Sequence, residues 1–343
     1  MSNASLDRLL ALLVMTMVVT GLATLRAGTA DLAWLFSLHG LAAAALLVGV
    51  ALKLSRSVPR SVAHAARSPT ALVRLAAALV VTATAVGSLS AGFVRAASDD
   101  PPTIRGWTLL TLHAWIGLAL VPLVVAHLLP LRWRLLRPGP AVIERTRRRI
   151  GRRQLLAGAG LITASIGLYG AVKTIDRAGG HARRFTGSRW RDAGGIPPPT
   201  TFLGEPVPGL DRLDPATWRL RVIGRVARHL ELTLDELRSL GREQLSAILD
   251  CTSGWALETA WGGVPMASVL DAAGIHPAAR IVDVRAVTGW GASMGIEEAR
   301  RCLLATEVGG SVLPAANGAP CRLVAPDRRG LDWVKWVTVI EVG

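Results

Sequence analysis

A series of long apolar blocks in the first half of the chain limits its fold most strongly. Leu, Ala, Val and Gly dominate residues 9–172, whereas residues 181–343 have the mixed charges of a globular domain. A run of about 18 or more apolar residues can cross a membrane as a helix. We therefore expect five spans, four in long blocks and the last in a shorter one rich in Ala and Gly, at residues 9–25, 32–54, 71–94, 107–131 and 155–172.

Positive charge between these blocks predicts their orientation. The connection at residues 53–74 carries only basic charge, and the one at 132–153 carries nine arginines against Glu144 alone. Basic loops stay cytoplasmic, so we expect a multi-pass protein of the plasma membrane with a cytoplasmic N-terminus. Five spans then place the C-terminal domain outside the cytoplasm. A net charge of +15 would suggest nucleic acid in a soluble protein. Here most of the excess lies between spans, which predicts a lipid bilayer and no nucleic acid as partner.

An arginine pair, Arg152 and Arg153, stands directly before the weak fifth span. A pair followed by a modest apolar stretch resembles a twin-arginine export signal, which a receptor reads. Ordinary cytoplasmic arginines are the alternative. The export interpretation gains weight if the exported domain receives its cofactor in the cytoplasm.

Histidines within the predicted spans are candidate ligands, because ionisable groups in a membrane are costly and usually functional. His39 and His113 lie near the outer ends of the second and fourth spans, at similar depth, where two imidazoles can clamp one b-type haem. His127 lies roughly 21 Å further along the fourth span, which suggests a second haem in the inner leaflet. Its one candidate partner is His64, in the basic loop before the third span. Interhelical hydrogen bonds or quinone binding are the alternatives. The segments 38–40 and 111–115 loosely resemble cytochrome-b-type anchors of bacterial redox proteins.

The C-terminal half shows irregularly mixed strands and helices. Residues 176–216 are rich in Gly, Pro and Arg and are expected to be a linker and lead-in. Alternation and turn residues predict strands at 218–222, 246–250, 281–287, 321–325 and 334–342. Helices are expected at 233–240, where Thr233 and Glu236 form a capping box, and at 265–273 and 295–301. This order favours a mixed α+β domain over a regular parallel array.

Cys251 opens a loop after one of these strands, where a thiolate can bind a soft metal or act as a nucleophile. A buried structural cysteine is the alternative. The segments 250–255 (DCTSGW), 261–265 (WGGVP), 318–326 (GAPCRLVAP) and 333–337 (WVKWV) resemble, in this order, the sulfite-oxidase-type molybdopterin oxidoreductases. The segment 183–188 (RRFTGS) resembles the lead-in of membrane-tethered members.

This resemblance implies a molybdopterin-binding fold for residues 183–343, with Cys251 as the molybdenum ligand and Thr252 and Ser253 beside the cofactor. Arg322 and Lys335 match basic positions that would neutralise the pterin phosphate, surface charge being the alternative. Two departures put the substrate in doubt: residues 201–205 (TFLGE) replace an Arg-Asn-His run, and residues 329–332 (RGLD) replace a Tyr-Gly-x-Lys pattern.

Together these features predict a multi-domain chain: an all-α transmembrane bundle of five spans followed by a mixed α+β sulfite-oxidase-type domain. The expected division is a four-span cytochrome-b-like part (1–150), the fifth span (151–175), a linker (176–216) and the molybdopterin domain (217–343, with its lead-in from 183). Cys302 and Cys321 are either a disulfide or two buried thiols.

The predicted function is extracytoplasmic two-electron, oxygen-atom-transfer chemistry on a small-molecule substrate, of the sulfite-oxidase or sulfoxide-reductase type. Electrons would be exchanged through b-type haem with the quinone pool or another redox partner. The alternatives are a haem-b electron-transfer protein with a cofactor-free binding domain and a scaffold without either cofactor. The substrate and the direction of electron flow stay open.

Overall fold

The computed structural model describes residues 3–65, 68–98, 103–104, 107–136, 152–179, 182–200 and 213–343. The chain divides into two compact units. The helical unit comprises Met1–Thr24, Ala33–Ile104 and Thr108–His181. The β-rich unit comprises Ala182–Gly343 with the short segments Leu25–Leu32 and Arg105–Trp107.

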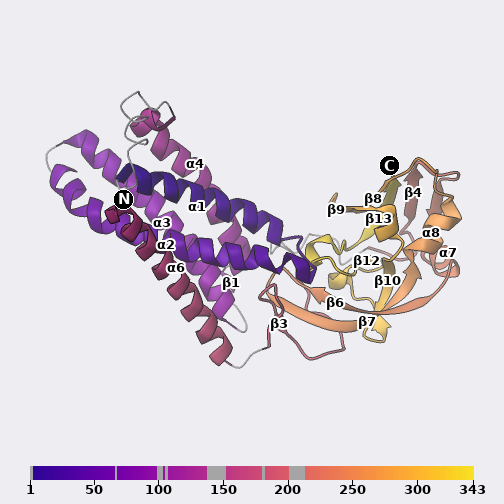
Figure 1. The fold of residues 1–343 in the computed structure, drawn as a ribbon. Coiled ribbons are helices and arrows are strands. Elements are labelled where there is room, and N and C mark those ends of the chain that lie inside the picture. The colour runs from indigo at the N-terminus through magenta and orange to yellow at the C-terminus, as the bar shows by residue number, and fades with distance from the viewer. Residues whose placement is uncertain are drawn as a thin grey trace. The chain divides into compact units, whose positions relative to one another are not determined.

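Five long helices build the helical unit (Figure 1): α1 (Asn3–Thr24), α2 (Ala33–Ala65), α3 (Pro69–Ala97), α4 (Leu109–Leu136) and α6 (Arg152–Ala178). Their connections include η1 (Ala30–Leu32) and the two-stranded pair β1 (Thr103–Ile104) and β2 (Trp107–Thr108). Each helix contains a stretch long and apolar enough to cross a membrane, at Ser5–Thr24, Ala30–Ala63, Pro69–Ala96, Leu109–His127 and Leu155–Ala178. The five expected helices are therefore present, and they indicate association with a membrane.

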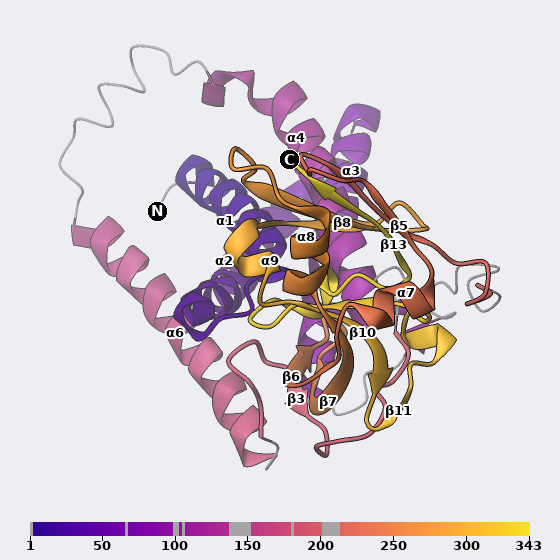
Figure 2. The ribbon, with the colours of Figure 1, turned by 90° about the vertical axis from the view of Figure 1, so that its right-hand side faces the viewer.

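The first four helices pack in a ring in which α1 contacts α2 and α4 while α3 contacts the same two helices. Helix α6 packs beside α2 (Figure 2). This contact is close at Gly40, where an added Cβ would lie 2.6 Å from the Tyr169 ring. Val14, Leu46, Ala85 and Leu120 form a small buried core between the helices.

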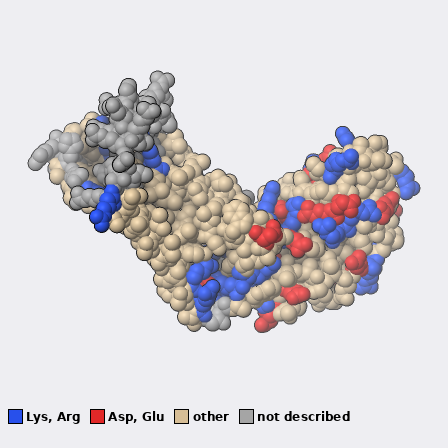
Figure 3. Space-filling model, in the orientation of Figure 1, with Lys and Arg blue, Asp and Glu red and all other residues tan. Residues whose placement is uncertain are grey.

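The outer faces of the same helices are also apolar. Leu12 is 63% exposed and Val73 is 69% exposed, and the surface of the helical unit is mostly uncharged (Figure 3). Helices that are hydrophobic all round belong in the core of a large protein or in a membrane. Burial among the described residues covers only a small share of each span, so lipid is the environment that suits these faces.

Two sheets form the β-rich unit (Figure 1). In one, β11 (Ser311–Val312), β10 (Leu303–Val308), β7 (Trp255–Pro265) and β3 (Arg189–Trp190) follow in this order, while β12 (Arg322–Val324) pairs with β10 and β6 (Glu243–Asp250) pairs with β7. The other has the order β5 (Leu230–Leu232), β4 (Leu220–Gly224), β13 (Val337–Val342), β8 (Ile281–Ala286) and β9 (Gly291–Gly295). Strand β13 runs parallel to β4 and antiparallel to β8.

Short helices complete this unit: α7 (Leu234–Ser239), α8 (Met266–Ala273), α9 (Ile296–Ala299), η3 (Ala315–Asn317) and η4 (Gly330–Asp332). The capping box at α7 is confirmed, since Thr233 Oγ1 accepts the Glu236 amide and the Glu236 carboxylate accepts the Thr233 amide. Helix α8 ends where Gly274 adopts a positive φ of 70°, a conformation that glycine reaches without strain. One large buried cluster joins both sheets and α8, which confirms a mixed α/β domain.

Strands β7 and β10 are the central strands of the first sheet, yet the sequence pattern did not predict them. Strand β7 contains Gly262 and Gly263, and glycine is uncommon in strands. The structure gives the reason for Gly263, because an added Cβ would clash with the Leu304 carbonyl oxygen on β10. The close approach of β7 and β10 thus requires glycine at position 263. The same glycine weakens the strand pattern of β7, so the sequence does not predict this strand.

Candidate functional site

Cys251 lies in the tight connection between β6 and β7, which pair as an antiparallel hairpin. The Cys251 amide donates to the Trp255 carbonyl at 2.9 Å, and the Gly254 amide donates to the Cys251 carbonyl at 3.0 Å. Gly254 has a φ of 111°, which only glycine adopts readily. The turn presents the Cys251 thiol partly exposed, with Thr252 buried beside it.

Two hydroxyl groups flank the thiol. Ser253 Oγ lies 3.0 Å from Cys251 Sγ, and Thr200 Oγ1, from the lead-in segment, lies at 3.2 Å. The other two cysteines are unlike Cys251. Cys302 and Cys321 are buried, free thiols and form no disulfide. Burial raises the pKa of Cys302 to about 12 and that of Cys321 further, so both are inert.

A buried charge network anchors the loop from behind. The Asp250 side chain is fully buried and accepts hydrogen bonds from Thr186 Oγ1 at 2.8 Å and Ser188 Oγ at 2.6 Å. Arg329 donates to the same carboxylate at 3.2 Å and to the Cys251 carbonyl at 3.4 Å. Arg184 forms a further ion pair with Asp250 at 3.4 Å. The network thus fixes the backbone immediately before and at Cys251.

Sequence reasoning gave no role to the members of this network. The sequence pattern marks residues 183–188 as a family lead-in and Arg329 only as a departure from the family pattern. One feature of the sequence does indicate such a network. Asp250 stands directly before the cysteine, and a carboxylate at the end of a buried strand needs hydrogen-bond or charge partners. Which residues supply them depends on contacts between positions more than 60 apart in the chain.

The two predicted basic residues come together beside the thiol. Arg322, on β12, is buried, lies over the Trp261 and Trp333 rings, and donates to the Asn317 carbonyl at 3.1 Å. Lys335 donates to the carbonyls of Thr200 and Ala316 at 2.8 and 2.7 Å. Both therefore contact carbonyl groups rather than carboxylates.

Burial and the mutual proximity of these groups shift the pKa values of both cations. Burial lowers the pKa of Arg322 to about 10. Burial and, next, the charge of Arg322 lower the pKa of Lys335 to about 7. A thiolate at Cys251 acts in the opposite direction on both groups. Within the part of the chain that the structure describes, neither cation has a carboxylate partner. The surroundings of the Cys251 thiol are therefore suited to an anion.

The residues fit a molybdopterin group in a further respect. Arg322 Nε and Trp261 Nε1 are buried nitrogen donors with no hydrogen-bond partner among the described residues. Buried donors usually have partners, and phosphate and pterin oxygens are suitable ones. The replaced lead-in at residues 201–205 lies outside the described residues. Trp255, Trp261 and Trp336 are buried.

The helical unit brings His39 and His113 together, with ring centroids 6.0 Å apart. His113 Nδ1 lies 2.8 Å from the Ser88 carbonyl, which can only accept, so Nδ1 carries the proton. His39 Nδ1 lies 2.9 Å from Thr20 Oγ1, whose own proton is donated to the Thr16 carbonyl at 2.6 Å. His39 Nδ1 must therefore donate too. In both rings Nε2 keeps its lone pair, as in histidines that bind metals.

The spacing of the pair also suits a metal. Two imidazoles that bind one ion through bonds of about 2 Å have ring centroids roughly 6 Å apart. Gly21 and Gly92 leave room for the rings, since added Cβ atoms would lie 3.2 Å from His39 Cε1 and 2.9 Å from His113 Nδ1. His127 lies at another part of α4 and lines a cavity. The side chain of its expected partner, His64, lies outside the described residues.

The β-rich unit is similar in sequence to known molybdopterin-dependent proteins. Residues 205–343 match the family model of the oxidoreductase molybdopterin binding domain. The chain is 26% identical over 235 residues to the protein-methionine-sulfoxide reductase catalytic subunit MsrP of Gluconobacter oxydans, covering 60% of this chain and 73% of that protein. It is 31% identical over 161 residues to MsrP of Xanthomonas campestris pv. campestris, covering 39% of this chain and 49% of that protein. The alignment thus spans about half the length of the Xanthomonas relative.

Among solved structures, the sulfane dehydrogenase SoxCD of Paracoccus pantotrophus matches with a TM-score of 0.37 and 26% identity, covering 38% of this chain and 39% of that chain.

Proposed function

We propose that this chain, whose C-terminal part is a sulfite-oxidase-type molybdopterin-binding oxidoreductase domain, is a membrane-anchored enzyme that reduces sulfoxides outside the cytoplasm with electrons drawn from the quinone pool. The observation that carries the proposal is the partly exposed Cys251 thiol beside buried Arg322 and half-buried Lys335, neither of which has a carboxylate partner among the described residues. Such a site has a soft ligand for a metal and positive charge for a phosphate.

The residues divide the work of holding the cofactor. Cys251 is the metal ligand, positioned by the Asp250 network. Arg322 and Lys335 neutralise the pterin phosphate, and Thr252 and Ser253 line the loop beside it. Molybdenum held by molybdopterin supplies two-electron oxygen-atom transfer when it is bound. The overall reaction joins a sulfoxide, two protons and two electrons and releases a thioether and water.

We favour sulfoxide reduction over sulfite-like oxidation because the Gluconobacter and Xanthomonas relatives are protein-methionine-sulfoxide reductase subunits. The two reactions use the same kind of centre in opposite directions. Sulfite oxidation with an artificial acceptor therefore serves as the comparison assay for the direction of electron flow.

In the helical unit, His39 and His113 are the residues that would hold one b-type haem. The support is their 6.0 Å centroid separation and the two Nδ1 protons held by Thr20 and Ser88. Haem supplies one-electron transfer, which links a two-electron centre to quinone. A second haem at His127 and His64 is not included in the proposal, because the His64 side chain lies outside the described residues.

The five spans and the basic connections support the proposed topology, in which the N-terminus is inside and the β-rich unit is outside. Arg152 opens α6, the fifth span. We propose that Arg152 and Arg153 serve as a twin-arginine signal, because a molybdopterin domain loaded in the cytoplasm has to be exported folded.

The decisive experiment measures molybdenum, pterin and haem in the full chain purified in detergent, together with reduction of methionine sulfoxide by dithionite-reduced benzyl viologen. Cys251→Ser should lose at least 90% of the activity and most of the molybdenum while haem absorbance is kept. Cys302→Ser, at a buried thiol that contacts Met294 and the Glu298 carbonyl, is the control. Full activity in Cys251→Ser, or a wild-type protein without molybdenum, would refute the proposal.

The haem part has its own test. His39→Leu and His113→Leu should each abolish the haem absorbance without changing the molybdenum content. His276→Leu, at an exposed histidine of the β-rich unit, should leave the spectrum unchanged. Haem present with molybdenum absent would instead favour a haem-b electron-transfer protein with a cofactor-free binding domain.

A further inference from the structure

A cavity between α1, α2, α3 and α4 has no part in the sites described above. Its volume is about 130 Å³. A dry cavity of about 150 Å³ lined by Leu, Ile and Phe holds one benzene ring. The cavity of the helical unit is therefore large enough for a single six-membered ring.

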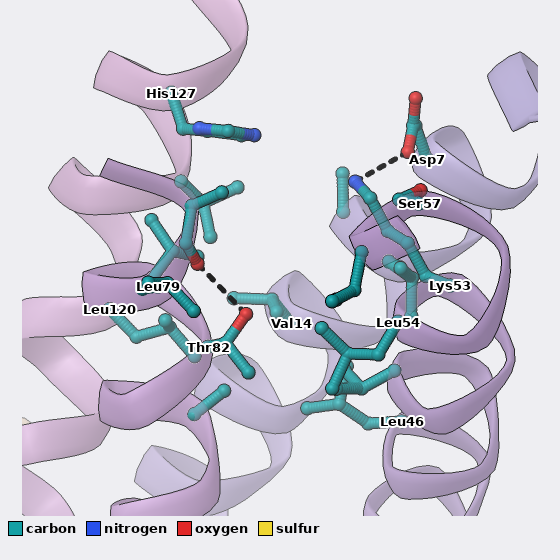
Figure 4. Close-up of a pocket in the computed structure, with 18 of the residues that line it drawn as sticks. Asp7, Val14, Leu46, Lys53, Leu54, Ser57, Leu79, Thr82, Leu120 and His127 are labelled. Atoms are coloured by element: carbon teal, nitrogen blue, oxygen red, sulfur yellow. Dashed lines mark hydrogen bonds and ion pairs between the residues drawn. The ribbon is translucent and has the colours of Figure 1, made fainter. Parts of the chain in front are cut away.

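Most of the wall is aliphatic, with Val14, Leu46 and Leu120 among its members. Polar groups gather on two facing sides (Figure 4). On one side, His127 projects from α4 toward the cavity. On the other, Lys53 of α2 forms an ion pair with Asp7 of α1.

The ion pair is well placed to bind a ligand from this wall. Lys53 Nζ lies 2.6 Å from Asp7 Oδ1, and the Asp7 side chain is only 2% exposed while that of Lys53 is 32% exposed. Lys53, expected at the start of a loop, lies within the candidate span Ala30–Ala63, and Asp7 lies near the start of the candidate span Ser5–Thr24. Ionisable groups in such spans are usually functional. Ser57 also lines this side, so the wall offers both donors and acceptors.

Polar groups facing each other across an apolar ring-sized space match one class of membrane compound. A para-quinone carries two oxygens on opposite sides of a six-membered ring. In the oxidised form the oxygens accept hydrogen bonds, which an ammonium group and an imidazole N–H can donate. In the reduced form the hydroxyl groups donate, which a carboxylate and an imidazole nitrogen can accept. Both walls can therefore serve both redox forms.

We propose that this cavity binds the head group of a membrane para-quinone or quinol between His127 and the Lys53–Asp7 pair. The inference rests on the proposed exchange of electrons with the quinone pool and names the place where it happens. His127 is then a quinone contact rather than a ligand of a second haem. A neutral apolar ligand also suits a cavity that lies within the membrane-spanning helices.

The test measures binding of decylubiquinone to the full chain by isothermal titration calorimetry in one fixed detergent. Lys53→Met and His127→Leu each remove one polar wall, and each should raise Kd at least tenfold. Ala78→Phe places a ring inside the cavity without removing any polar group and should have the same effect. Ala77→Phe, on the exposed side of the same helix, and Lys173→Met on α6 should stay within twofold of wild type.

Three results would overturn the assignment: no binding by the wild-type chain, unchanged Kd in both Lys53→Met and Ala78→Phe, or an equal loss in Ala77→Phe. Loss of one haem per chain in His127→Leu would assign His127 to a second haem instead. Molybdenum content and viologen-driven activity are measured on the same samples. They test the proposed function independently, since neither depends on quinone.

Discussion

Replacing Asp250 tests whether the buried network behind Cys251 holds the metal-binding loop in place. Asp250→Asn keeps the shape of the side chain and removes its charge. It leaves Arg329, whose side chain is 4% exposed, without its carboxylate. Removing one partner of a buried ion pair costs about 3–5 kcal/mol. In a unit of 150–250 residues, each kcal/mol lowers the unfolding temperature by roughly 2–4 °C, so we expect a decrease of about 6–20 °C.

Thermal unfolding can be followed by tryptophan fluorescence of the full chain in detergent, since most of the 11 tryptophans lie in the β-rich unit. Maleimide labelling of Cys251 gives a local reading. Its rate should rise severalfold in Asp250→Asn because the loop loses its anchor, while buried Cys302 and Cys321 stay slow. Asp271→Asn is the matched control. It breaks an exposed pair with Arg300, and such surface pairs contribute about 0–1 kcal/mol.

A double-mutant cycle completes the test. Asp250→Asn combined with Arg329→Met removes the carboxylate and its buried arginine and leaves only Arg184, whose side chain is 16% exposed. The double variant should therefore be no less stable than the worse single variant. The coupling between the two sites should then be about 2 kcal/mol or more. The anchoring role would be refuted if Asp250→Asn lowered the unfolding temperature by less than 2 °C. Additive effects of the two substitutions in the double variant would refute it as well.

Two further predictions follow from single positions. Lys335 has a folded pKa of about 7, whereas an unfolded lysine keeps its proton to about 10.4. Between these values the unfolded chain binds more protons, so the unfolding free energy rises with pH. The gain is at most about 5 kcal/mol, and denaturation of the β-rich unit at pH 7 and pH 10 should show this rise in wild type and not in Lys335→Met. Gly92→Ala should reduce haem absorbance per chain at least twofold, because its Cβ would lie 2.9 Å from His113 Nδ1. Gly87→Ala on the same helix, where an added Cβ meets nothing within 4 Å among the described residues, should not, and equal spectra in the two variants would contradict the packing argument.

The sequence alone determined the features that depend on local pattern. Length and apolarity predicted the five helices, because a span must satisfy its own backbone in lipid. The capping box predicted α7, and the segments 250–255 and 318–326 predicted the molybdopterin domain around Cys251. Depth along the spans indicated that His39 and His113 could meet. Each of these properties depends on residues that are close in sequence, within one span, one helix start or one loop.

Tertiary structure decided what depends on distant residues meeting. Strand β7 was missed because its glycine at position 263 serves the close approach to β10, and the pattern of β10 itself did not predict a strand. The partners of Asp250 come from positions on both sides of the hairpin, and no local pattern specifies them. Likewise, Lys53, Asp7 and His127 are ordinary polar residues in sequence, and only the packing of the helices places them around one cavity. Local chemistry thus located the cysteine, and long-range packing defined what surrounds it.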